Sequence, residues 1–171
     1  IAKRAAEQTT MLVAPTVTYA PAQFNMNFPG TVSIRAQTFA ILIEDIFRAL
    51  TRQGFGFIYV LNGHGANLGP IRSAVHDLYL DLDDAAPQIH VRNWWDFSSV
   101  NKLREKLYGE WEGMHGTPSE IAITQSVTRV VSSSAGPPKA ISTQYIYDHS
   151  GDFHAPASEH IREFPDGRVG S

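Results

Sequence analysis

Phe57-Ile58-Tyr59-Val60-Leu61-Asn62-Gly63-His64-Gly65-Ala66-Asn67 is the stretch that decides the fold. It opens on a compact apolar run, which predicts a buried strand, and continues into a glycine-containing turn. A helix is predicted next, because its apolar residues recur at helical spacing: Leu68, Ile71, Val75, Leu78 and Leu82. A strand, a turn and a helix in this order are the first part of a βαβ unit.

The flanking sequence repeats this alternation. Met11 to Ala14, closed by Pro15, predicts an earlier buried strand, and Gln88 to Trp94 predicts a later one. Shorter helices are expected around residues 2 to 8, 100 to 108 and 118 to 127. We therefore expect an α/β protein, a three-layer αβα sandwich around a mainly parallel sheet, with residues 1–171 forming one domain.

A longer helix is predicted between two local signals. Ser33 can cap its start, and Gly54 can end it. Its apolar positions are Ile34, Ile41, Leu42, Ile46, Ala49 and Leu50. By contrast, Ser132 to Ser171 is rich in Ser, Pro, Gly and His, which predicts loops.

Composition excludes several classes of function. A net charge of −3, from 14 basic and 17 acidic residues, provides no broad cationic surface, so we expect no nucleic-acid partner. The absence of cysteine excludes disulfides and thiolate metal sites. No apolar run reaches the roughly 20 residues that span a bilayer, so we expect no membrane association and a cytoplasmic protein.

Two constellations could carry chemistry, and the first is Asn62 to Asn67. It lies where a strand passes into a helix, the edge at which open α/β sheets bind ligands. Gly63 and Gly65 would let a ligand approach the backbone, and His64 offers an imidazole to a metal. The alternative is structural: the glycines make the turn, Asn67 caps the helix, and His64 is a surface or hydrogen-bonded histidine.

The second constellation runs from Gly113 to Glu120. Thr117, Pro118 and Glu120 form a helix start with a capping box, which is a sufficient structural role for Glu120. His115 precedes this helix N-terminus, where a neutral imidazole is favoured and could accept a proton. Trp111 could lie over a bound ligand or could simply pack.

The remaining histidines have weaker claims. His76 falls on a predicted helix and His90 in a predicted strand. The tail has the composition of a metal cluster, but its spacings match no local ligand motif, so we interpret its residues as ordinary polar side chains: His149, His154, His160, Asp148, Asp152 and Glu159.

Taken together, the two constellations resemble the creatininase family, which includes creatinine amidohydrolases and related formamide deformylases. Asn62 to Asn67 resembles the family motif Asn-Gly-His-Gly-Gly-Asn, and His115 to Ala122 resembles His-Ala-Gly-x-x-Glu-Thr-Ser. Phe28-Pro29-Gly30-Thr31 resembles a third motif, Phe-Pro-Gly-Thr, and Gly167 to Gly170 resembles the stretch before the last family helix.

The resemblance implies a metal-dependent amidohydrolase that cleaves a carbon–nitrogen bond of a small cyclic or linear amide at two metal ions. It implies that His64 and Glu120 are metal ligands, that His115 moves protons, and that Asn62, Gly63 and Gly65 surround the ligands. Zinc is the first expectation for the metal, with manganese and iron as alternatives. Family members also imply a homo-oligomer, possibly a hexamer.

Two departures from the family pattern matter. The motif Glu-x-His-Gly-x-His-x-Pro, which supplies most other ligands, belongs before Ile1, so we expect a chain that lacks its N-terminal metal-binding segment and its C-terminal end. Asn25 stands where many members have histidine. The alternatives are a formamide or peptide substrate, or an inactive relative that serves as a binding or structural subunit.

Overall fold

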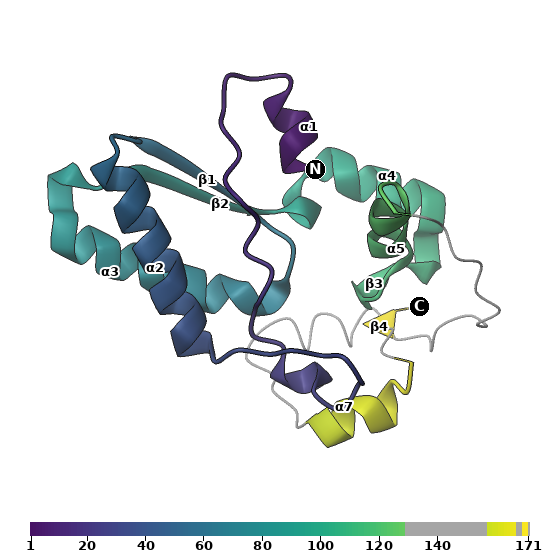
Figure 1. The fold of residues 1–171 in the computed structure, drawn as a ribbon. Helices are drawn as coiled ribbons and strands as arrows, with labels where there is room; N and C mark the ends of the chain where they lie inside the picture. The colour runs from purple at the N-terminus through teal and green to yellow at the C-terminus, as the bar shows by residue number, and fades with distance from the viewer. Residues whose placement is uncertain (129–156, 167–168, 171) are drawn as a thin grey trace. The chain divides into compact units, whose positions relative to one another are not determined.

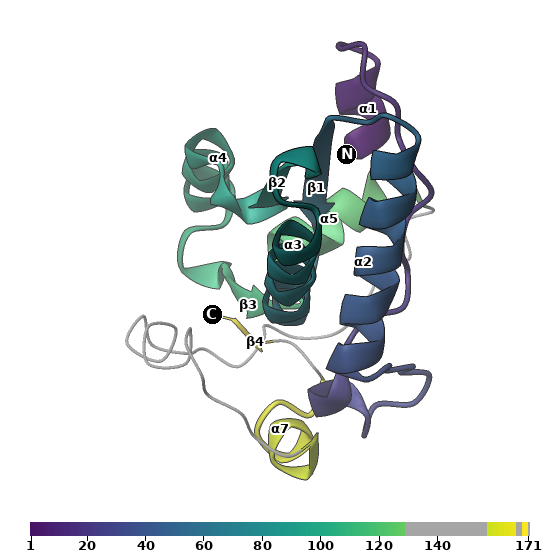
Figure 2. The same ribbon diagram turned by 90° about the vertical axis from the view of Figure 1, so that its left-hand side faces the viewer.

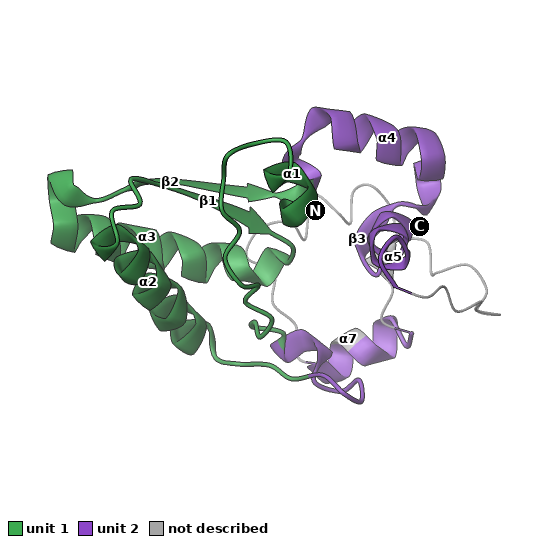
Figure 3. Cartoon of the chain, turned by 45° about the horizontal axis from the view of Figure 1, so that its top comes forward, with its two compact units in different colours: residues 1–22, 32–94 green, residues 23–31, 95–171 purple. Residues whose placement is uncertain are grey.

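The computed structural model describes residues 1–128, 157–166 and 169–170 (Figure 1). The chain divides into two compact units, which Figure 3 colours separately. Unit 1 comprises Ile1–Ala22 and Val32–Trp94, and unit 2 comprises Gln23–Thr31 and Trp95–Ser171. Each unit therefore contains one of the two constellations predicted above.

Unit 1 is built on a parallel pair of strands, β1 (Phe57–Asn62) and β2 (Gln88–Asn93). Their register pairs Phe57 with Gln88 and Asn62 with Asn93, so both strands end at the same edge. A parallel pair needs a crossover, and here it is α3 (Leu68–Leu82). The predicted strand, turn and helix, the later strand and the α/β class are confirmed.

The core of unit 1 lies between one face of this sheet and the helices α2 (Ala36–Arg52) and α3, which pack against each other (Figures 1 and 2). The buried residues recur at three- and four-residue intervals on the helices: Phe39, Ile43, Phe47, Ile71, Ala74 and Leu78, joined by Ile58 of β1. Burying each large apolar side chain contributes about 1.5–3 kcal/mol, so this cluster fixes the sheet against the helices.

The opposite face of the sheet carries exposed aromatic rings. Phe57 and Tyr59 are 43% and 38% exposed, and their centroids lie 5.2 and 6.5 Å from that of His90. Within the described residues of unit 1, both long helices cover the other face. The α/β arrangement is thus observed, while the second helical layer of a sandwich stays a prediction.

Charged side chains also join α2 to α3. Arg48 donates to Glu44 at 2.6 and 2.8 Å and to Asp81 on the neighbouring helix. These hydrogen bonds, first to Glu44 and then to Asp81, raise the pKa of Arg48. The pairs are partly exposed to water, with side chains between 22% and 56% exposed, and they add little to the stability that the apolar core provides.

Two local predictions in unit 1 are wrong. Residues 11–14 lie outside any strand of the described chain, and Leu12 is 80% exposed, because an apolar run needs a pairing partner to become a strand. Ser33 does not cap α2, which begins at Ala36; its hydroxyl instead accepts a hydrogen bond from the Ala22 N–H at 2.8 Å.

The predicted apolar face of α2 is also corrected. Ile41 and Leu42 are exposed, whereas Phe39, Ile43 and Phe47 form the buried stripe. Gly54 follows the helix with φ of +88°, a conformation that favours glycine, so the predicted helix end is confirmed. The first predicted helix is observed as α1 (Ala2–Ala6).

Unit 2 contains the predicted helices as α4 (Ser98–Tyr108) and α5 (Pro118–Gln125). Between them lies β3 (Gly113–His115), which pairs antiparallel with β4 (Val169–Gly170). The prediction of loops from Ser132 onward is wrong in part, since α7 (Ala157–Glu163) is helical. No helix in the described parts of the chain is both long and apolar enough to cross a membrane.

Candidate functional site

The turn that carries His64 is organised by the buried amide of Asn62. The Asn62 Oδ1 accepts from the His64 N–H at 3.2 Å and from Asn67 Nδ2 at 3.0 Å. Its Nδ2 donates to the His64 carbonyl at 2.8 Å and to Asn93 Oδ1 at 2.7 Å. An asparagine amide has two donor hydrogens and two acceptor lone pairs, so all of its capacity is used.

Asn93 completes this arrangement from the neighbouring strand. It is the residue in register with Asn62, and the two side chains are 6% and 3% exposed. Because a buried amide that loses its partner costs about 1–3 kcal/mol, the pair fixes the ends of both strands and the start of the turn. Asn67 occupies the N-cap position of α3 as predicted, but its side chain makes no capping hydrogen bond and donates to Asn62 instead.

The imidazole of His64 has a defined partner. Its Nε2 lies 2.8 Å from the carbonyl oxygen of Pro21, and a carbonyl only accepts, so Nε2 carries a proton. In the neutral ring the lone pair is then on Nδ1. The Pro21 segment is itself held, because Ser33 accepts from the Ala22 N–H and the Ile34 N–H donates to Ala20 at 3.2 Å.

The glycines on either side of His64 are not required by the turn itself. Neither Gly63 nor Gly65 has a positive φ. A Cβ added at either position would meet no atom of the described chain within 4 Å. Their lack of a side chain leaves open space beside His64, as close approach of a ligand would require.

In unit 2, the half-buried His115 ends β3. Its Nε2 lies 3.5 Å from Asn25 Nδ2, and its ring is nearly perpendicular to that of Phe24, with the ring centroids 6.3 Å apart. Asn25, which departs from the family pattern in sequence, thus contacts the predicted proton carrier.

Glu120 forms the predicted capping box at the start of α5. Its Oε2 accepts from the Thr117 N–H at 3.1 Å, and its own N–H donates to Thr117 Oγ1 at 3.3 Å. The structural role weighed from the sequence is therefore confirmed. A carboxylate has more acceptor positions than this one bond uses, so the cap and metal ligation are compatible.

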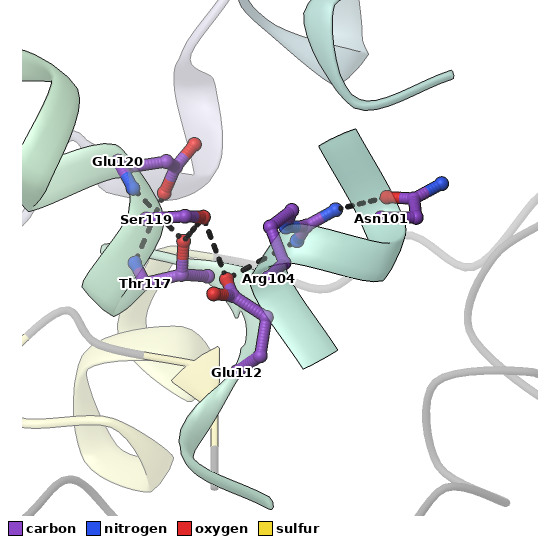
Figure 4. A network of polar contacts seen from close by, with 6 residues as sticks. All are labelled: Asn101, Arg104, Glu112, Thr117, Ser119 and Glu120. Carbon is purple, nitrogen blue, oxygen red and sulfur yellow. Dashed lines mark hydrogen bonds and ion pairs between the residues drawn. The ribbon is translucent and has the colours of Figure 1, made fainter. Parts of the chain in front are cut away.

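Figure 4 shows that the capping box belongs to a larger polar network. Ser119 lies 3.0 Å from Thr117 Oγ1 and donates to Glu112 Oε1 at 2.8 Å. Arg104 of α4 donates to the same Glu112 oxygen at 3.1 Å. Glu112, which precedes β3, thereby connects this strand to the first turn of α5 and to α4.

The other predicted site residues are placed as follows. Trp111 ends a short 3-10 helix and is 46% exposed. His149 and His154, with Asp148 and Asp152, lie outside the described residues. Glu159 and His160 lie on α7.

His64 belongs to unit 1, whereas His115 and Glu120 belong to unit 2. Within residues 1–128, 157–166 and 169–170, no three His, Asp or Glu side chains come close enough together to hold a metal ion. A catalytic zinc usually has three protein ligands. Joint metal binding by His64 and Glu120 therefore stays a prediction.

Two residues of these networks were missed by sequence reasoning. Asn93 is the last residue but one of the predicted strand Gln88 to Trp94, and the register of parallel strands could have suggested that it faces Asn62. Glu112 carries no such signal, because its partners lie on α4 and α5 and are reached only when the chain folds.

Comparison with known proteins supports the resemblance. The family described as "Creatinine amidohydrolase" matches residues 1–171. A "Creatinine amidohydrolase" of Pseudomonas putida is 29% identical over 137 residues, 72% of this chain and 52% of that protein. A "Mycofactocin precursor peptide peptidase" of Mycobacterium ulcerans (strain Agy99) is 32% identical over 78 residues, 46% of this chain and 31% of that protein. The matched regions span about half or less of these relatives.

The Asn62–Asn93 pair makes a testable contribution to stability. Asn93→Ala removes the acceptor of a buried amide N–H and should lower the free energy of unfolding by about 1–3 kcal/mol in urea denaturation. Arg92→Ala, at the exposed neighbouring position, is the control and should stay within about 0.5 kcal/mol of the parent. Equal stability of the two variants would contradict the proposed importance of the pair.

Proposed function

Since the chain belongs to the creatininase family, we propose that the protein is a metal-dependent hydrolase that cleaves the carbon–nitrogen bond of a small amide. The observation that carries this proposal is the fixed imidazole of His64. It lies at the carboxyl end of β1, where α/β sheets bind their ligands, and its Nε2 donates to a backbone carbonyl.

That hydrogen bond is typical of a metal-binding histidine. Such a residue usually donates one ring N–H to a carbonyl or carboxylate, which orients the ring and directs the other nitrogen to the metal. His64 has this donor at Nε2, with Pro21 as its partner. We therefore assign Nδ1 as its metal-binding atom.

Glu120 is the second proposed ligand. The Thr117 N–H holds its Oε2 at 3.1 Å, so the carboxylate is oriented by its own helix start. The remaining ligands are proposed by family resemblance and are not assigned to residues of this chain. A bound divalent ion supplies a Lewis acid that polarises the amide carbonyl and makes water acidic near neutral pH.

His115 is the proposed proton carrier. A histidine with a pKa near neutrality is the usual residue for this role, and here the ring lies 3.5 Å from Asn25 Nδ2. The ring is half-buried on β3 and is held beside Phe24. In this role it would take a proton from water and return it to the departing nitrogen.

The relatives suggest two substrate classes. One is named for creatinine, a cyclic amide, and the other for a precursor peptide. Both names describe cleavage of amide bonds. A small cyclic amide is proposed as the substrate, with a formamide or peptide amide as the alternative. Trp111, which is 46% exposed, is proposed to contact it.

A second candidate function is a non-catalytic binding subunit. The capping box favours it, because helix capping alone accounts for the position of Glu120. Metal binding separates the candidates: a non-catalytic relative has no need of a ligand at Glu120.

The finer proposal for the fold is a three-layer αβα sandwich. Its support is the exposed face of the β1–β2 sheet, where Phe57 and Tyr59 would be covered by a further helical layer. Contiguous exposed apolar patches often mark a surface that another element or a partner covers.

Loss of either proposed ligand should reduce metal binding in the full-length protein. His64→Ala and Glu120→Gln should each weaken zinc or manganese affinity by more than about 100-fold, since losing an outer partner alone costs about 10–100-fold. Glutamine preserves the capping box, so Glu120→Gln should stay folded. Elemental analysis after dialysis, with competition titration, measures the effect.

Exposed residues of the same type serve as controls for these two variants. His90→Ala and Glu110→Gln should bind metal as the parent does. Parental metal content in both His64→Ala and Glu120→Gln would contradict the proposed function.

His115 should matter for hydrolysis and not for metal content. His115→Ala should lower kcat by about 10²–10⁴-fold, the usual contribution of general acid–base catalysis, and should retain metal. His76→Ala, an exposed histidine on α3, is the matched control. Amide hydrolysis assays on both variants decide the matter, and full activity of His115→Ala would remove its assigned role.

A further inference from the structure

The network around Glu112 contains a chain of hydrogen bonds with one direction. Glu120 donates its N–H to Thr117 Oγ1 at 3.3 Å, and Thr117 Oγ1 lies 3.0 Å from Ser119 Oγ. Ser119 Oγ lies 2.8 Å from Glu112 Oε1. All four side chains are drawn in Figure 4.

Simple counting of protons fixes the direction. An ionised carboxylate only accepts, so the Ser119 hydroxyl donates its single proton to Glu112. Ser119 must then accept from Thr117, whose hydroxyl proton points to Ser119. Thr117 is left to accept the N–H of Glu120. The chain therefore runs from the Glu120 backbone, through two hydroxyls, to the Glu112 carboxylate.

Burial makes this chain strong. Thr117 and Ser119 are 3% and 6% exposed, and the Glu112 side chain is 13% exposed. In such surroundings successive hydrogen bonds polarise one another, and a charge at the end strengthens each of them. The negative charge of Glu112 thus makes Thr117 Oγ1 a better acceptor for the first turn of α5.

Arg104 holds the anchor in place. Its Nη2 donates to Glu112 Oε1 at 3.1 Å, and its Nη1 donates to Asn101 on the same helix at 3.0 Å. The Arg104 side chain is 17% exposed, so the pair is shielded from solvent. The carboxylate that ends the hydroxyl chain is therefore fixed to α4.

We infer that Glu112 is a positioning residue for Glu120, acting through the hydroxyls of Ser119 and Thr117. The chain holds the backbone of Glu120, and the same Thr117 donates its N–H to the Glu120 carboxylate. Glu112, Ser119 and Arg104 thereby control the orientation of a proposed metal ligand without touching it. This inference rests on the proposed function in so far as Glu120 binds metal.

Ser119→Ala tests the inference, because it breaks the chain and leaves the capping box of Thr117 and Glu120 intact. In the full-length protein it should weaken zinc or manganese affinity, at most by the about 10–100-fold that follows loss of a group bonded directly to a metal ligand. The readout is competition titration with a chromophoric chelator. Ser126→Ala, an exposed hydroxyl at the other end of α5, is the control and should bind metal normally.

A double-mutant cycle separates positioning from general loss of stability. Glu112→Gln keeps an acceptor oxygen but removes the charge, and it should also weaken metal binding. If both residues act through one chain, the double variant should bind metal about as tightly as the single variant with the lower metal affinity. Multiplying fold-changes in the double variant would overturn the inference. Should Ser119→Ala fail to fold, a parental metal affinity in Glu112→Gln would equally overturn it.

The outcomes distinguish the two proposals. Weak metal binding in Glu120→Gln with parental affinity in Ser119→Ala would overturn the positioning role and leave the proposed function standing. Parental affinity in Glu120→Gln would overturn the inference, and parental affinity in both Glu120→Gln and His64→Ala would overturn the proposed function as well. Weak binding in Glu120→Gln and Ser119→Ala, with parental affinity in Ser126→Ala, is the result that the inference expects.

Discussion

The bond between the amides of Asn62 and Asn93 is the constraint on which the candidate site of unit 1 depends. It joins the last residues of two parallel strands at 2.7 Å, where both side chains are buried. Asn62 uses its remaining capacity on the backbone of His64 and the side chain of Asn67. Leaving any donor or acceptor of a buried amide unpaired costs free energy, so the turn has one favoured conformation. The turn fixes the backbone of His64, and the hydrogen bond to the Pro21 carbonyl fixes the orientation of its imidazole.

Unit 2 uses charge where unit 1 uses neutral amides. The Glu112 carboxylate accepts hydrogen bonds from Arg104 and Ser119, and Ser119 in turn contacts Thr117 at the start of α5. Removing one partner of a shielded ion pair is costly, since it leaves the other charge without compensation. In each unit, one proposed metal ligand is therefore held by a network of polar groups that hydrogen-bond to one another. Such preorganisation is what a catalytic constellation requires of its supporting residues.

Local signals made much of this predictable, and distant partners account for the rest. The strand, turn and helix around His64 and the capping box at Glu120 follow from adjacent residues, and both are observed. Met11 to Ala14 has the composition of a strand but lacks a pairing partner in the described chain. Ser33 accepts a hydrogen bond from the Ala22 N–H and does not cap the helix that follows it. Glu112 acts through partners that only folding brings near, so sequence spacing could not assign it a role, whereas the register of two parallel strands could have suggested the role of Asn93.

The central claim is that His64 and Glu120 are ligands of a functional metal ion. Anomalous X-ray diffraction from crystals of the full-length protein grown with zinc or manganese tests it most directly. The account predicts anomalous density about 2.0–2.2 Å from the Nδ1 atom of His64 and from a carboxylate oxygen of Glu120. Metal bound elsewhere, with His64 still on the Pro21 carbonyl and Glu120 serving only its helix cap, would contradict it.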